Sequence, residues 1–119
     1  MKLLYLDCFA GISGDMFLGA LLDLGVPADQ LRAELAKLSL PGYTLSTLRV
    51  VKQNITATKV ECLPAPSVRP PPQRGYAEIA ELIEGSALAD PVKQRARHVF
   101  RRIGEAEAAI HGVPLAEIH

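Results

Sequence analysis

The chain has 119 residues, 49% of them hydrophobic, and its 13 basic side chains balance 13 acidic ones. This length corresponds to one domain with a modest core. Because the formal net charge is zero and Trp is absent, we expect no nucleic-acid partner and no attraction to an anionic membrane surface.

Cysteine usage and the start of the chain predict a cytoplasmic protein. Cys8 and Cys62 form no C-x-x-C motif and are too few for a disulfide framework. A reducing cytoplasm is therefore the expected location. The first apolar run stops at Asp7, which argues against a signal peptide, and no later run has the length of a membrane span.

The first part of the chain predicts a strand and two helices. The apolar run at residues 3–6 predicts a buried strand, and residues 16–22 predict a buried helix. Gly25 is expected to end that helix, and Pro27 to begin the next. The second helix is predicted at about residues 28–38, because leucines recur there on one face.

A hairpin and a linker follow. β-branched residues predict strands at about residues 43–52 and 55–63. Gln53 and Asn54 are short enough for a tight turn, since Asn tolerates positive φ. Residues 64–75 are rich in proline and predict an extended linker with polyproline character.

Two helices are predicted after the linker. The first covers about residues 76–84. The second is expected to have Asp90 as its N-cap and Pro91 in its first turn, and to end at Gly112. Its apolar residues recur at spacings of three and four, which indicates a core or helix-packing seam. The seam residues are Val92, Ala96, Val99, Ile103, Ala106 and Ile110.

These elements predict an α+β fold with a small sheet and helices packed on one face, in the order β-α-α-β-β-α-α. An α/β subdomain is expected at residues 1–63 and a helical segment at 76–119. The linker at 64–75 joins them, and all three are parts of one truncated domain.

The glycine-containing loop between the first strand and the first helix is the most informative segment. Gly11, Ser13 and Gly14 are candidate cofactor-binding residues, because free N–H groups at a helix N-terminus attract phosphates. Asp7 and Asp15 are candidate catalytic residues that bind a divalent ion or orient a substrate group.

The spacing of this loop also fits other interpretations. It lacks the Gly-Lys-Ser/Thr of a Walker A loop, the third glycine of the dinucleotide fingerprint and the G-x-S-x-G order of a nucleophile elbow. A plain β-to-α turn, with Gly11 and Gly14 at positive φ and Ser13 as cap, explains the same spacing. A phosphotransferase with Asp7 as nucleophile is a third interpretation, but Phe9 interrupts the Asp-x-Asp pattern such enzymes often show.

The residues of the loop are more specific than their spacing. The string Leu-Asp-Cys-Phe-Ala-Gly-Ile-Ser-Gly-Asp-Met at residues 6–16 resembles the N-terminal part of the nickel insertion proteins, which complete the nickel-pincer cofactor of lactate racemase. Residues 52–60, 79–83 and 100–112 resemble the same family. The resemblance runs over essentially the whole chain and covers only the front part of the family's length.

The resemblance implies a nickel-inserting lyase, a CTP-dependent cyclometallase of cofactor biosynthesis and protein maturation. Its substrates would be nickel and the pincer precursor, pyridinium-3,5-bisthiocarboxylic acid mononucleotide, whose sulfur donors suit nickel. The family's CTP site, with its accompanying Mg²⁺, is implied outside this chain. The missing C-terminal part is therefore an expected partner, and we expect the chain alone to be inactive.

The histidines give little support for a metal site. The family's proline-rich region is often rich in histidine, whereas residues 64–75 contain none. The family continues from the position of His119 into a histidine- and glutamate-rich cluster, so the resemblance makes His119 the candidate metal residue. His98 lies among arginines that repel a cation, and His111 is expected to cap a helix C-terminus.

An alternative is a non-catalytic structural or assembly module. Its last helix would then pack through the apolar seam against the missing part of the protein or within a homo-oligomer.

Overall fold

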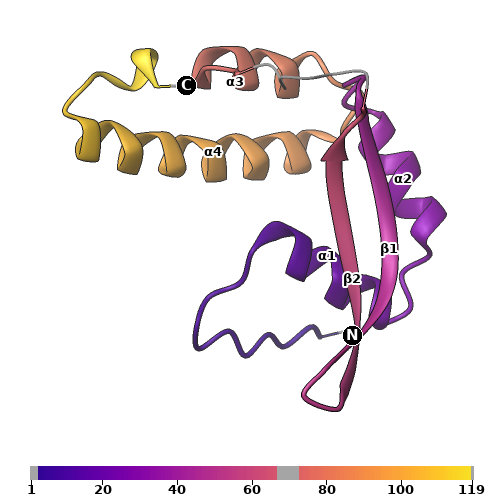
Figure 1. Cartoon of the computed structure of the whole chain (residues 1–119). Coiled ribbons are helices and arrows are strands. Elements are labelled where there is room, and N and C mark those ends of the chain that lie inside the picture. Colours follow the sequence, from indigo (N-terminus) through magenta and orange to yellow (C-terminus); the bar gives the residue numbers. More distant parts are fainter. Residues whose placement is uncertain (1–2, 67–72, 119) are drawn as a thin grey trace.

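The computed structural model describes residues 3–66 and 73–118, and Figure 1 shows how their helices and strands are arranged. The elements confirm the predicted α+β class. In chain order they are α1 (Gly14–Asp23), α2 (Ala28–Ala36), β1 (Tyr43–Lys52), β2 (Ile55–Pro64), α3 (Tyr76–Glu84), α4 (Asp90–His111) and the short 3-10 helix η1 (Leu115–Glu117).

The predicted hairpin is confirmed with its two-residue turn. Strands β1 and β2 pair antiparallel, with Lys52 opposite Ile55 beside the turn. Gln53 and Asn54 have φ values of 49° and 63°. Positive φ at both central residues gives the turn the twist that two-residue hairpins favour, and Asn accepts this backbone conformation more readily than most residues.

Helices α1 and α2 lie on one face of the hairpin, as predicted. Leu45 and Val60 point to this face, because Leu45 stands opposite Cys62, two positions beyond Val60 on β2. Val60 lies near α1 and is only 1% exposed. At the closest approach, Gly19 of α1 is buried against the main chain of β2, and a Cβ atom there would collide with the carbonyl oxygen of Thr58. A glycine at this position therefore allows α1 to pack directly on β2.

The predicted strand at residues 3–6 is wrong. This segment has no strand conformation, and Leu3 and Tyr5 are 84% and 80% exposed. It runs away from the hairpin before the chain turns back into α1 (Figure 1). A strand needs a neighbour to pair its N–H and C=O groups, and the described residues contain only the β1–β2 sheet. The following helix formed as predicted, but only Gly19 of α1 is fully buried.

Helices α3 and α4 form a second unit with η1. Ile83 of α3 is 3% exposed, and Gly104 of α4 is buried beside Tyr76 and Leu115. Gly112 ends α4 at a φ of 67°, as predicted. Asp90 is the first residue of the helix rather than its N-cap, which is Ala89. No helix of the described ranges is long and apolar enough to cross a membrane.

The apolar seam of α4, predicted as a core or a helix-packing seam, is not part of the core of the described residues. Val99, Ile103 and Ile110 are 54%, 52% and 80% exposed. The reason is that α3 packs against a neighbouring face of α4, the one that contains Gly104. Half of the predicted linker, residues 67–72, lies outside the described residues.

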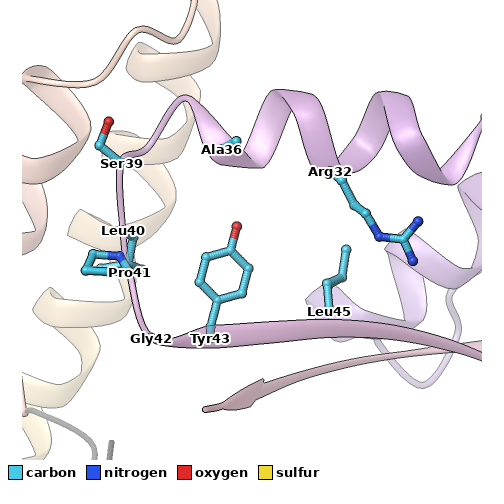
Figure 2. A pocket seen from close by; sticks show the side chains of 8 residues that line it. All are labelled: Arg32, Ala36, Ser39, Leu40, Pro41, Gly42, Tyr43 and Leu45. Atoms are coloured by element: carbon cyan, nitrogen blue, oxygen red, sulfur yellow. The ribbon is translucent and has the colours of Figure 1, made fainter. Parts of the chain in front are cut away.

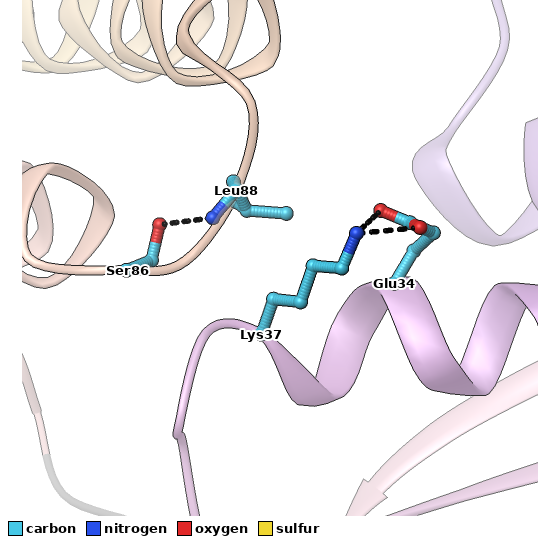
Figure 3. Close-up of polar contacts among 4 residues, drawn as sticks. All are labelled: Glu34, Lys37, Ser86 and Leu88. Carbon is cyan, nitrogen blue, oxygen red and sulfur yellow. Dashed lines mark hydrogen bonds and ion pairs between the residues drawn. The ribbon is translucent and has the colours of Figure 1, made fainter.

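The two units meet where α2 ends. The backbone N–H of Ala87, in the turn after α3, donates to the carbonyl oxygen of Lys37 at 3.0 Å. Figure 3 shows the polar contacts on both sides of this junction. The Lys37 ammonium binds both carboxylate oxygens of Glu34 at 2.7 Å, and the Ser86 hydroxyl accepts a 3.4 Å hydrogen bond from the Leu88 N–H.

The chain exposes far more surface than a compact protein of its size. Its radius of gyration is 16.2 Å, whereas about 13.5 Å is typical of 119 residues. Its accessible surface is 9282 Å², against about 6,300 Å² for a compact monomer of this mass. Much apolar surface is therefore left open, and it includes the segment before α1 and the seam of α4.

Candidate functional site

The glycine loop enters α1 through a tight turn. Gly11 has a φ of 82°, as predicted, and its N–H donates to the Cys8 carbonyl oxygen at 2.9 Å. Gly14 does not take the positive φ that we predicted, because it is already the first residue of α1. The loop residues that we singled out are all exposed, including Asp7 and Asp15.

Asp15 occupies the N-terminus of α1. Its carboxylate accepts a hydrogen bond from the Ser13 hydroxyl, and that bond lowers the pKa of Asp15, with smaller contributions from the backbone N–H groups of Met16 and Asp15. Ser13 stands at the N-cap position but its side chain does not cap the helix, contrary to the prediction. The protein itself thus supplies a negative charge, the Asp15 carboxylate, at the helix N-terminus, where the helix dipole stabilises it.

This arrangement changes what the loop can bind. A bare phosphate approaching Ser13 and Gly14 would meet the ionised Asp15 carboxylate and be repelled. A divalent cation would instead be attracted by the carboxylate, and it would provide charge for a phosphate or carboxylate ligand. The loop geometry therefore favours a cation-bridged ligand over direct phosphate binding.

No complete metal site stands in the described part of the chain. Within residues 3–66 and 73–118, no three Cys, His, Asp or Glu side chains gather closely enough to hold an ion. The candidate metal residue His119 lies outside these residues. His111 is in the last turn of α4, where its Nε2 lies 3.5 Å from a Glu107 carboxylate oxygen.

A polar cluster that we did not predict joins α1 to the hairpin. Arg49 donates to the Asp23 carboxylate at 2.6 Å and to the Thr58 hydroxyl at 2.8 Å, and the Thr58 hydroxyl donates to Asp23 at 2.8 Å. The Thr58 hydroxyl and Arg49 lower the pKa of Asp23. The two-residue turn places Arg49 opposite Thr58, so the sequence contained the signal for that pair but not for Asp23.

A hollow of about 500 Å³ lies between α2 and β1. Figure 2 shows that Tyr43 and Leu45 point from β1 toward α2 and that Arg32 projects from α2. The Arg32 guanidinium is held by Asp29 at 3.1 Å, and its side chain is 45% exposed. The hollow combines one aromatic ring, aliphatic side chains and one cation, a composition found in small-molecule sites. No sequence motif indicated it, because its walls come from two elements and the loop between them.

Comparison with known proteins finds similarity over almost the whole chain. The profile of a family described as nickel insertion protein matches residues 4–119. The chain is 47% identical over its full length to the pyridinium-3,5-bisthiocarboxylic acid mononucleotide nickel insertion protein of Geobacillus kaustophilus, covering 31% of that protein. It is 46% identical to a putative nickel insertion protein of Citrifermentans bemidjiense and 48% identical to one of Syntrophobacter fumaroxidans, covering 30% of each.

The chain thus spans about a third of the length of these relatives. No solved structure matches it. The similarity extends through both structural units, from the glycine loop to the end of α4 and η1.

Proposed function

Because the chain belongs to the nickel insertion protein family, we propose that it supplies the N-terminal part of a protein that inserts nickel into pyridinium-3,5-bisthiocarboxylic acid mononucleotide. The observation that carries this proposal is 47% identity, over the whole of this chain, to 31% of a relative with that name. Nickel and the mononucleotide are substrates in this reaction. The protein's task is to position them and to exclude other metals.

The finer points of the reaction rest on the family resemblance. CTP would be consumed by a cytoplasmic lyase that closes the nickel–carbon bond, and Mg²⁺ would accompany the nucleotide. Both sites are proposed for the remaining two thirds of the relatives' length. The chain alone is therefore expected to bind the mononucleotide without completing nickel insertion.

Within this chain, the glycine loop is the proposed mononucleotide site. Asp15, whose pKa the Ser13 hydroxyl holds below its usual value, would hold a divalent ion at the start of α1, with Asp7 as a second carboxylate. The N–H groups of Gly11 and Gly14 and the Ser13 hydroxyl would then contact the ligand's phosphate. The exposure of all these residues is consistent with a site completed by another part of the protein.

Binding measurements test this role of the loop. The pincer mononucleotide is titrated into wild type, Ser13→Ala and Asp15→Ala by calorimetry, with and without Mg²⁺ or Ni²⁺. Loss of one charge-assisted hydrogen bond should weaken binding by roughly tenfold. The Asp15→Ala effect should appear only when a divalent ion is present.

Two control variants make the result specific. Asp29→Ala removes a first-turn carboxylate from another helix, and that side chain is 97% exposed, so affinity should not change. Arg32→Ala removes the cation beside the hollow between α2 and β1. Unchanged affinity in Ser13→Ala and Asp15→Ala, with a loss in Arg32→Ala, would assign binding to that hollow instead of the loop.

The exposed seam of α4 favours a second candidate function, assembly without a ligand. A module of this kind would bind no mononucleotide in any of these titrations. It would still restore nickel insertion when added to the C-terminal two thirds of a relative, because its contribution would be structural.

A further inference from the structure

The hollow between α2 and β1 has an aromatic ring toward one end and a cation toward the other. Tyr43 and Leu45 point from β1 toward α2, and Arg32 projects from α2 on the far side of Leu45 from Tyr43 (Figure 2). Two positions along a strand span about 7 Å, so a compound with one ring and one side group is long enough to contact both ends. The volume of about 500 Å³ is in the range of small-molecule pockets.

Main-chain hydrogen bonds hold the loop that closes one end of the hollow. The Ser39 N–H donates to the Ala36 carbonyl oxygen at 3.0 Å, and the Gly42 carbonyl oxygen accepts from the Ala65 N–H at 2.8 Å. Between these bonds the chain passes from α2 into β1, with positive φ values of 52° at Ser39 and 83° at Gly42. This wall is therefore formed before a ligand binds, which lowers the entropic cost of binding.

Two polar side chains of the hollow have hydrogen-bonding groups to spare. Within residues 3–66 and 73–118, the Tyr43 hydroxyl has no hydrogen-bond partner, and Arg32 bonds only through Nη1, 3.1 Å from an Asp29 carboxylate oxygen. Asp29 is 97% exposed, so this ion pair is weak. The Nε and Nη2 N–H groups of Arg32 are therefore available to a carboxylate.

The charges around the hollow favour a ligand with one negative charge. Among the described residues, Arg32 is the one charged side chain in its lining. Ala36, the last residue of α2, lies above the Tyr43 ring (Figure 2), and the negative end of the helix dipole disfavours a second anionic group there. A ligand is expected to place its anionic group at Arg32 and an uncharged ring at Tyr43.

We propose that this hollow is a binding site for a small aromatic monocarboxylate. The carboxylate accepts hydrogen bonds from the Nε and Nη2 N–H groups of Arg32, the planar pair of donors that suits a carboxylate. The ring of the ligand packs against the Tyr43 ring and the Leu45 side chain. The site is separate from the proposed mononucleotide site, because no residue of the glycine loop lines the hollow within the described part of the chain.

A chemical-shift titration of the ¹⁵N-labelled chain with benzoate tests the site. Saturable shifts are expected for the amides of residues 36–45. Benzamide has nearly the same shape without the charge and should bind about tenfold more weakly. Phenyl phosphate carries a second negative charge and should also bind more weakly than benzoate. Absence of saturable shifts at residues 36–45, equal affinity for benzamide, or tighter binding of phenyl phosphate would overturn the proposal.

Variants identify the groups that bind the probe. Arg32→Gln should lower benzoate affinity by about tenfold, with unchanged circular dichroism because the Arg32 side chain is 45% exposed. Tyr43→Leu should lower it by roughly fivefold through loss of ring packing. Arg101→Gln is the matched control, because Arg101 also forms an exposed ion pair within one helix, at 2.8 Å from Glu105. Wild-type affinity in Arg32→Gln, or an equal loss in Arg101→Gln, would overturn the proposal.

The glycine-loop variants separate this proposal from the proposed function. Ser13→Ala and Asp15→Ala should bind benzoate as tightly as wild type, whatever their effect on the mononucleotide. A tenfold loss of benzoate affinity in either variant would place the probe at the loop and overturn the assignment to the hollow.

Discussion

The hairpin unit and the helical unit each pack around one buried aliphatic side chain and one glycine, but the glycines face different kinds of neighbour. In each, one aliphatic side chain is almost fully buried, Val60 in the hairpin unit and Ile83 in the helical unit, and one glycine marks the closest approach of two elements. Gly19 faces the main chain of β2, whereas Gly104 faces two side chains, the end of Leu115 and the ring of Tyr76. Main chain in a sheet cannot move aside, but a side chain can change rotamer.

The two units also differ in how much of their surface is used for contacts within the chain. The hairpin unit ties α1 to both strands through the Asp23, Arg49 and Thr58 cluster. In the helical unit, the apolar seam of α4 is exposed. We infer that the hairpin unit positions the glycine loop, while the helical unit joins this part of the protein to other polypeptide.

The largest expected effect comes from destabilising the helical unit alone. Ile83→Ala should cost about 3 kcal/mol of unfolding free energy, because it removes a buried aliphatic side chain and leaves a cavity. A backbone hydrogen bond from the Ala87 N–H to the Lys37 carbonyl oxygen links the two units. Hydrogen exchange should therefore show faster opening of α3 and α4, with unchanged protection of the β1–β2 amides.

Val60→Ala is the matched variant in the hairpin unit. It should lower protection of the hairpin and α1 and leave α3 and α4 as in wild type. Equal loss of protection in both units from either variant would show that they unfold together, and the contrast between them would then be wrong.

The two glycines should respond to alanine with opposite signs. Gly19→Ala should cost about 2 kcal/mol, because overpacking against the Thr58 carbonyl outweighs the gain of about 1 kcal/mol in helix propensity. At Gly104 a new Cβ atom would lie 2.6 Å from Leu115 Cδ1, which a rotamer change relieves. Gly104→Ala should therefore be neutral or slightly stabilising in urea denaturation. A large destabilisation at Gly104 would mean that the α4–η1 contact is as rigid as the α1–β2 contact.

Local sequence signals predicted what depends on neighbours along the chain. The turn at Gln53–Asn54 set the hairpin register and hence the pairing of Arg49 with Thr58. The prediction of a strand at residues 3–6 was wrong because an apolar run does not reveal whether another strand is available to pair with it. The seam of α4 was recognised from its period, but periodicity shows only that a face is apolar, not what covers it.

The candidate site divides in the same way. The positive φ of Gly11 followed from the turn that a glycine permits. The bond from Ser13 to Asp15 depends on a side-chain rotamer, and the hollow beside Arg32 depends on how α2 lies over β1. Neither arrangement has a local sequence signal.

Acid should weaken the hairpin unit through Asp23. Its folded-state pKa is lowered by the Thr58 hydroxyl and by Arg49, so its contribution is present above the unfolded pKa of about 3.9 and is lost as pH falls through the lower folded value. Thr58→Val should bring the two pKa values closer and flatten the loss of stability below about pH 4. Thr58→Ser keeps the hydroxyl and should retain the wild-type pH slope. A pH slope in Thr58→Val equal to that of wild type would exclude Asp23 as the cause.

The smallest expected effect is at the hairpin turn and measures how independent the hairpin unit is. Gln53 holds a φ of 49°, which costs most L-residues free energy, whereas Asn accepts it at lower cost. Gln53→Asn should therefore stabilise the protein by about 0.5 kcal/mol. If the units open separately, hydrogen exchange will slow only for the β1–β2 and α1 amides. Slower exchange in α4 as well would mean that the stabilities of the two units are coupled through the Ala87–Lys37 junction.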